Sequence, residues 1–152
     1  MAITPESILG DLKNKNYSPV YFLQGEETFY IDQISDFIEN NVLSEAEKGF
    51  NQTVLYGRDA AMNIVLTNAK RFPMMAERQV VIVKEAQNIP DINREVGQKM
   101  LCDYLDNPVP STILVFCHKN KSLDKRKALG KAVEKKAVAL TTKKIYDNQV
   151  PG

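Results

Sequence analysis

Residues 78–84 read RQVVIVK, and this stretch decides the fold. Four branched aliphatic residues stand in a row, which is the pattern of a strand covered on both faces, not of one with a solvated face. Residues 111–117, STILVFC, have the same character. The two stretches therefore predict neighbouring central strands of a mostly parallel sheet.

Outward from this centre, strand-like runs alternate with helical patterns along the whole chain. Pro73 is expected to end the helix that precedes RQVVIVK, because proline breaks a helix interior. Strands are predicted at 20–24, 50–57, 78–84, 111–117 and 137–144, and helices from Thr4 and at 28–43, 60–72, 91–106 and 122–136, the last capped by Ser122. This order predicts an α/β fold, a three-layer sandwich with a five-stranded, mostly parallel sheet. Residues 1–145 are expected to form this domain, and 146–152 to start a connection to a further domain that the chain lacks.

The composition is that of an ordinary globular domain, with 43% hydrophobic and 26% charged residues among 152. No apolar run approaches the roughly 20 residues of a membrane helix, and the N-terminus has no secretory pattern. Cys102 and Cys117 are interpreted as free core thiols in a reducing cytoplasm. Residues 118–152 carry 10 basic and 3 acidic side chains. That excess fits an anionic partner, an acidic neighbouring domain or simply a solvated lysine-rich helix face.

The turn after the first strand is where such a sheet would bind a nucleotide phosphate. It reads LQGEETFYID, and Gly25 is its only glycine, followed by Glu26 and Glu27. A phosphate loop needs several glycines and a Gly-Lys-Ser/Thr ending, and two carboxylates would repel the anion. At the end of RQVVIVK, Lys84 stands where an NTPase places the acid that holds Mg²⁺.

Other chemistry is equally weak in the sequence. His118 has no paired acid or nucleophile nearby and is interpreted as a surface or strand-end residue. No group of residues has metal-ligand spacing. The residues favour a non-catalytic domain without cofactor or metal. A nucleotide-binding P-loop-like domain, either a weak NTPase or a regulatory ATP binder, is the alternative, supported by the fold alone.

Three segments in this order, PVYFLQGEETFYIDQI (19–34), RFPMMAERQVVIVKEA (71–86) and YLDNPVPSTILVFCHKNKSLDKRKAL (104–129), give the chain a family resemblance. It resembles the N-terminal domain of the delta subunit of bacterial DNA polymerase III, part of the clamp loader. The resemblance implies an AAA+-like domain with a degenerate nucleotide site. It also implies a non-catalytic role in binding the ring-shaped sliding clamp and helping to open it for loading onto primed DNA.

In that family the clamp is gripped by a leucine and a phenylalanine shortly before the third strand. The matching positions here are Met74 and Met75, and Phe72 supplies the aromatic ring if the register shifts. These three are the implied clamp-binding residues; the competing interpretation of the methionines is core filling. The resemblance further implies contacts with the gamma/tau and delta-prime subunits, mainly through domains absent here, and with DNA through the complex. The basic helix 122–136 would face DNA or another subunit.

Overall fold

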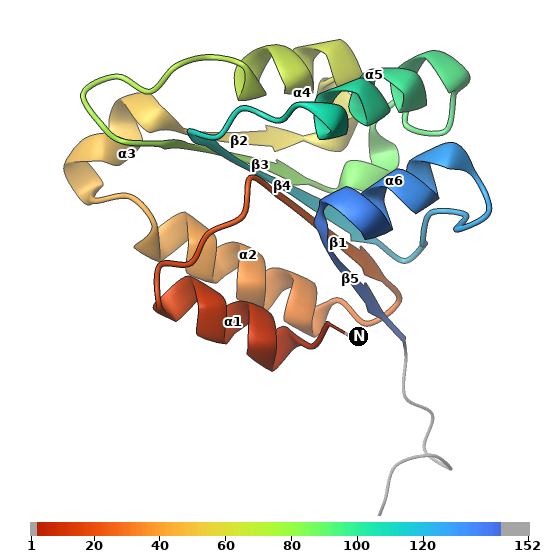
Figure 1. Cartoon of the computed structure of the whole chain (residues 1–152), viewed down its shortest axis with the longest axis horizontal. Coiled ribbons are helices and arrows are strands. Elements are labelled where there is room, and N and C mark those ends of the chain that lie inside the picture. Colours follow the sequence, from red (N-terminus) through yellow and green to blue (C-terminus); the bar gives the residue numbers. More distant parts are fainter. Residues whose placement is uncertain (1–2, 144–152) are drawn as a thin grey trace, which may run out of the picture.

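The computed structural model describes residues 3–143, which fold around one five-stranded sheet (Figure 1). The strands run in the order β2-β3-β4-β1-β5 and all pairs are parallel. Their bounds are β1 Val20–Gly25, β2 Gln52–Tyr56, β3 Gln79–Lys84, β4 Thr112–Lys119 and β5 Val138–Thr142; the helices are α1 Pro5–Lys13, α2 Phe29–Asn41, α3 Glu45–Asn51, α4 Met62–Ala69, α5 Glu95–Asp106 and α6 Ala128–Lys136, with single 3₁₀ turns η1 Gly57–Asp59 and η2 Ala86–Asn88.

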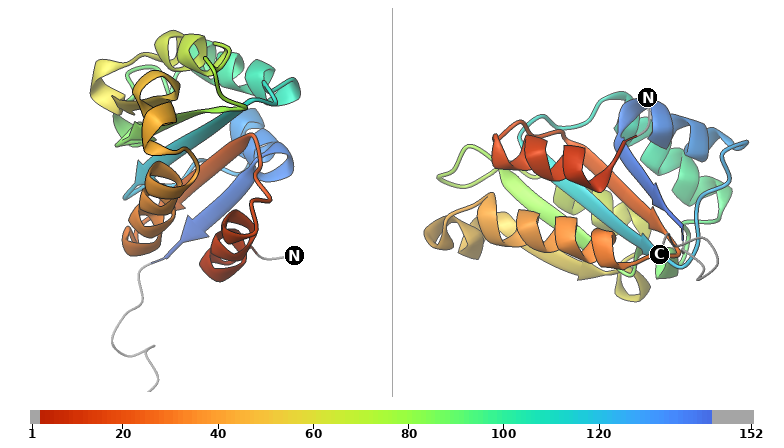
Figure 2. Two further views of the ribbon diagram at one scale, coloured as in Figure 1. Left: turned by 90° about the vertical axis from the view of Figure 1, so that its left-hand side faces the viewer. Right: turned by 90° about the horizontal axis from the view of Figure 1, so that it is seen from below.

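Helices cover both faces of the sheet, so the predicted three-layer sandwich is confirmed (Figures 1 and 2). Helices α1 and α2 pack on one face, and α4, α5 and α6 on the other. Strand β3 shows why: Val81 and Val83 enter the core under α4 and α5, while Val80 and Ile82 enter the core against α2. The unbroken apolar run that marks this strand in the sequence thus serves two cores at once.

The structure corrects the sequence prediction between the second helix and the second strand. A short helix, α3, occupies part of the range assigned to a strand, and Phe50 and Asn51 form its last turn. Its start is a capping box, in which the Ser44 hydroxyl accepts from the Glu47 N–H at 3.3 Å and the Glu47 carboxylate accepts from the Ser44 N–H at 2.9 Å. Strand β2 consequently begins at Gln52.

Two helices begin later than predicted, and the aspartate ahead of each accepts a hydrogen bond from outside that helix. Asp91 accepts the N–H of Met62 at 2.9 Å and so caps α4, while α5 starts at Glu95. Asp124 accepts the N–H of Arg126 at 2.9 Å in a tight turn, and α6 starts at Ala128. Such local side-chain bonds compete with helix formation.

Three remaining expectations concern the ends, the membrane and the cysteines. The predicted boundary at 145 and the connection at 146–152 lie outside the described residues. Within residues 3–143 no helix has the length and apolar character needed to cross a membrane. Cys102 and Cys117 are free thiols, and burial raises the pKa of Cys117 to about 11.

Candidate functional site

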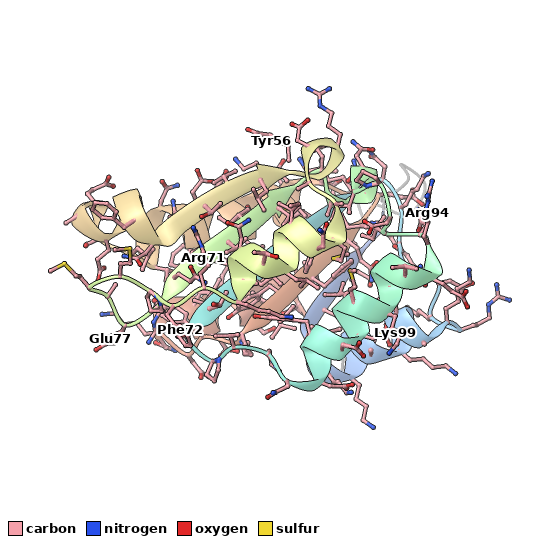
Figure 3. All side chains as sticks on the ribbon, turned by 90° about the horizontal axis from the view of Figure 1, so that it is seen from above. Tyr56, Arg71, Phe72, Glu77, Arg94 and Lys99 are labelled. Carbon is pink, nitrogen blue, oxygen red and sulfur yellow. The ribbon has the colours of Figure 1, made fainter. Side chains whose placement is uncertain are left out.

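The loop between α4 and β3, residues 70–78, displays large apolar side chains at the amino end of the sheet, where the strands begin. The exposed fractions are 82% for Phe72, 60% for Met74 and 101% for Met75. The core-filling interpretation of the methionines is therefore wrong, because both side chains are exposed to solvent. Figure 3 shows Phe72 and Glu77 on this loop. Exposed apolar side chains gathered on one segment are a feature of interaction surfaces.

The loop begins earlier than predicted, because α4 ends at Ala69 and not at Pro73. The buried side chain of Gln79 ends the helix: its Nε2 lies 3.0 Å from the Asn68 carbonyl oxygen and 2.7 Å from that of Arg71. The Thr112 hydroxyl donates to the Ala69 carbonyl at 2.6 Å. The first residues of β3 and β4 thus satisfy the carbonyls that a helix leaves free at its end.

A second anchor holds the loop at its middle. Asn51, only 2% exposed at the end of α3, accepts the Met74 N–H at 2.6 Å and donates Nδ2 to the Met74 carbonyl at 2.9 Å. The same Nδ2 lies 3.1 Å from the Glu47 carbonyl oxygen. Both backbone groups of Met74 are therefore satisfied by one buried side chain that belongs to another element.

Next to this anchor, the backbone of Met75 adopts an unusual conformation. Its φ is 55°, in the left-handed region that residues with a Cβ seldom adopt. Such a conformation costs roughly 1–2 kcal/mol for an L-residue and persists only where the surroundings impose it. In this conformation the Met75 side chain is fully exposed to solvent.

Behind the loop lies a hollow of about 470 Å³. Its walls come from the α1–β1 connection, the end of α2, and α3, together with residues 75–78. The Arg78 guanidinium lies over the Tyr17 ring, 4.8 Å from its centroid, in a cation–π contact. Phe50, 73% exposed on α3, adds another apolar side chain beside the residue that anchors Met74. Neither Phe50 nor Asn51 is among the predicted site residues, because both lie in α3, where the sequence pattern predicts no helix.

The carboxyl end of the sheet, where a nucleotide would bind, is closed by the chain itself. Gly25 has φ 128°, and a Cβ there would lie 2.1 Å from the Thr142 carbonyl oxygen at the end of β5. The Thr142 hydroxyl donates to the Glu27 carbonyl at 2.6 Å. The Glu27 carboxylate in turn accepts the Phe29 N–H at 2.9 Å, at the first turn of α2. A helix N-terminus that would attract a phosphate thus already holds a carboxylate.

Two lysines at this end of the sheet, Lys119 and Lys84, are paired with carboxylates. Lys119 Nζ lies 2.7 Å from Asp32 and 3.7 Å from Glu85. Partial burial works to lower the pKa of Lys119, but these two acids outweigh it and the pKa is raised. Lys84 pairs with Glu39 at 3.4 Å, and its pKa is raised in the same way against the effect of burial. Among residues 3–143, no group of three or more His, Cys, Asp or Glu could hold a metal ion.

His118 is buried in β4 and does not lie on the surface. Its Nδ1 lies 2.9 Å from the Lys121 carbonyl oxygen, which can only accept, so Nδ1 carries the proton. Burial lowers the pKa of His118, because the charged imidazolium would lose its hydration. The ring packs at 5.6 Å from that of Phe22.

The basic segment 122–136 is also different from the prediction. Only α6 is helical, and Ser122 does not cap it, since the N-cap is Lys127 without a side-chain bond. Several of its charges are paired with acids: Arg126 with Asp124 at 3.1 Å, Lys125 with Glu134 at 3.3 Å, and Lys136 with Asp106.

The fold of this chain also occurs in proteins related to subunits of DNA polymerase III. A solved gamma-subunit-related protein of DNA polymerase III from Thermotoga maritima has the same fold, with a TM-score of 0.55 over 96% of this chain and 47% of that one, at 13% identity. Together with the delta structure described next, it confirms the predicted AAA+-like α/β fold.

The family follows from closer matches. The model of the family "DNA polymerase III, delta subunit" matches residues 21–143, and the chain belongs to this family. The delta subunit of Bacillus subtilis (strain 168) is 30% identical over 138 residues, 88% of this chain and 40% of that protein. The solved Bacillus subtilis DNA clamp loader delta protein superimposes with a TM-score of 0.80 at 29% identity, covering 93% of this chain and 43% of that one. The chain thus spans about two fifths of the length of these relatives, and the resemblance found in the sequence is confirmed.

Proposed function

We propose that this chain is the clamp-binding domain of a clamp loader, and that Phe72, Met74 and Met75 insert into an apolar pocket of the sliding clamp. The observation that carries the proposal is the anchored loop 70–78, which holds three exposed apolar side chains away from the body of the domain. Membership of the delta subunit family supports it. Phe50 on α3, next in sequence to Asn51, is a further exposed apolar side chain.

Methionine suits this role physically. Its unbranched, polarizable side chain adapts to a shallow pocket that accepts several partners. Burying two such side chains supplies roughly 3–6 kcal/mol. Micromolar binding needs about 8 kcal/mol after the costs of ordering are met. Burial of the Phe72 ring would add roughly 1.5–3 kcal/mol, and the preformed shape of the loop would reduce the cost of ordering.

The proposed role is non-catalytic. Support comes from the carboxyl end of the sheet, where Thr142 closes the turn at Gly25 and the Glu27 carboxylate occupies the first turn of α2. In this role the domain uses binding energy to help open the ring for loading onto primed DNA. Further domains would join it to the gamma/tau and delta-prime subunits. The basic residues of 122–136 would face DNA or a neighbouring subunit.

The test is surface plasmon resonance of this chain against the sliding clamp of the same organism. We expect the double variant Met74→Ala/Met75→Ala to bind at least about a hundredfold more weakly, because roughly 3 kcal/mol or more of burial is lost. Val96→Ala on α5 is the matched control, since it removes an exposed apolar side chain from another face. Phe72→Ala tests the register: a larger loss than for Met74→Ala makes the ring the main anchor. Equal binding by the double variant and the unmodified chain would sink the proposal.

A further inference from the structure

Among residues 3–143, only the buried side chain of Asn51 hydrogen-bonds both the N–H and the carbonyl of Met74. It donates to the carbonyl and accepts from the N–H, while its own position is fixed by α3 and by the 3.1 Å contact with the Glu47 carbonyl. A side chain that satisfies both groups of one peptide residue sets the position and the direction of the backbone there. Met74 therefore cannot turn without breaking two hydrogen bonds.

We infer that Asn51 is a positioning residue for clamp docking, a latch that holds Met74 and Met75 in the shape that the clamp accepts. This inference rests on the proposed function and adds to it a residue outside the loop. The latch acts before binding: it orders the loop in the free domain, so that ordering does not oppose association.

The conformation of Met75 supports the inference independently. A free loop would relax a methionine at φ 55° to the extended or right-handed region. The conformation is retained one residue after the anchored peptide, where the chain direction is imposed by Asn51. Strain of this kind at an exposed, fully solvated side chain is a feature of binding elements that are shaped in advance.

The latch residue Asn51 and the contacting residues should affect different rate constants of clamp binding. If Asn51 only sets the fraction of molecules with a docking-competent loop, its loss lowers the association rate by that fraction. Removing a contacting side chain instead raises the dissociation rate. Fixing one residue's backbone corresponds to about one power of ten in affinity. We therefore expect Asn51→Ala to associate roughly tenfold more slowly with little change in dissociation.

Two variants separate the two halves of the latch. Asn51→Ala removes both hydrogen bonds to Met74, whereas Asn51→Asp keeps an acceptor for the N–H but loses the donor and places a carboxylate against the carbonyl. Hydrogen exchange of the Met74 amide, followed in the free chain, reports the latch without any partner. We expect Met74 exchange to be fast in Asn51→Ala and slower in Asn51→Asp, and clamp association to be slowest in Asn51→Ala and faster in Asn51→Asp.

The control for a merely structural effect is Gln98→Ala on α5, which removes the side-chain hydrogen bond to the Ile92 carbonyl and touches neither Asn51 nor Met74. It should lower the melting temperature while leaving Met74 exchange and clamp association unchanged. An Asn51→Ala chain that associates as fast as the unmodified one overturns the inference, even where Met74→Ala/Met75→Ala still loses binding and the proposed function stands. If the unmodified chain does not bind the clamp, the proposed function fails, and the inference with it.

Discussion

The two ends of the sheet differ in whether their side chains interact within the domain or are exposed to solvent. At the carboxyl end, the turn at Gly25 packs against Thr142, and Lys119 and Lys84 are paired with acids. At the amino end, the loop 70–78 keeps its backbone anchored while its apolar side chains remain in solvent. At the carboxyl end the polar groups interact with one another, whereas at the amino end apolar side chains are exposed to solvent.

The difference shows that a fold and its customary site are separable. Parallel α/β sheets place ligands outside the carboxyl ends of their strands. Here that end is used for internal packing, and the surface suited to a partner lies at the opposite end. Experiments that open the carboxyl end or release the amino end test this division directly.

The largest effect is expected from Gly25→Ala. A methyl group would lie 2.1 Å from the Thr142 carbonyl oxygen, and alanine is strained at φ 128°. We expect a loss of about 3–5 kcal/mol in the free energy of unfolding, measured by urea denaturation. The matched control is Gly49→Ala in α3, where nothing lies within 4 Å of an added Cβ and the change should stabilise by about 0.5–1 kcal/mol. A loss below 1 kcal/mol at position 25 would mean that the carboxyl end is not tightly closed.

At the amino end, Gln79→Ala is expected to cost about 2–3 kcal/mol. The variant leaves the carbonyls of Asn68 and Arg71 without their buried donor and opens a gap beside Thr112. The comparison variant Gln98→Ala, which loses one bond to Ile92, should cost about 1 kcal/mol. Both values come from urea denaturation. Equal costs would show that the end of α4 does not depend on Gln79.

Sequence reasoning predicted most of this fold and part of the site, for reasons visible in particular residues. The runs VVIV and TILVF are unambiguous because a strand buried on both faces has no polar alternative. Exposure of the methionines followed from the family register. Helix α3 was missed because seven residues are too few for a clear periodic pattern, although Ser44 and Glu47 form a capping box that could have revealed it.

The closed carboxyl end was only half predictable. Glu26 and Glu27 argued against a phosphate from sequence alone. The packing of Gly25 against Thr142 joins positions 117 residues apart, and no local pattern reports such a contact. The same holds for Asn51 and Met74, which lie 23 residues apart. Long-range hydrogen bonds made by single side chains are the part of a site that a sequence does not display.

The contribution of His118 to the free energy of unfolding should change only at acidic pH. Because burial lowers its pKa in the folded state, the unfolded chain binds a proton first as the pH falls below about 6.5. Its contribution to stability is therefore complete above that pH and is lost progressively below it. His118→Asn keeps a donor near the Lys121 carbonyl but does not titrate. The stability difference between the unmodified chain and this variant should shrink from pH 7.5 to pH 5.5 in urea denaturation, and a constant difference would contradict the buried neutral ring.

Adding ATP and Mg²⁺ should leave the melting temperature of the domain unchanged. A ligand at a hundred times its Kd stabilises by about 2.7 kcal/mol, which raises the melting temperature of a domain this size by several degrees. We expect no rise at millimolar ATP, since the Glu27 carboxylate already accepts the Phe29 N–H at the start of α2. The sharper version uses Glu26→Ala/Glu27→Ala. If charge alone excluded the phosphate, this variant would gain a shift; because Thr142 fills the space beside Gly25, it should show none either. A rise in the melting temperature of the double variant would mean that the two charges alone exclude the nucleotide. A rise for the unmodified chain would mean that the domain binds ATP.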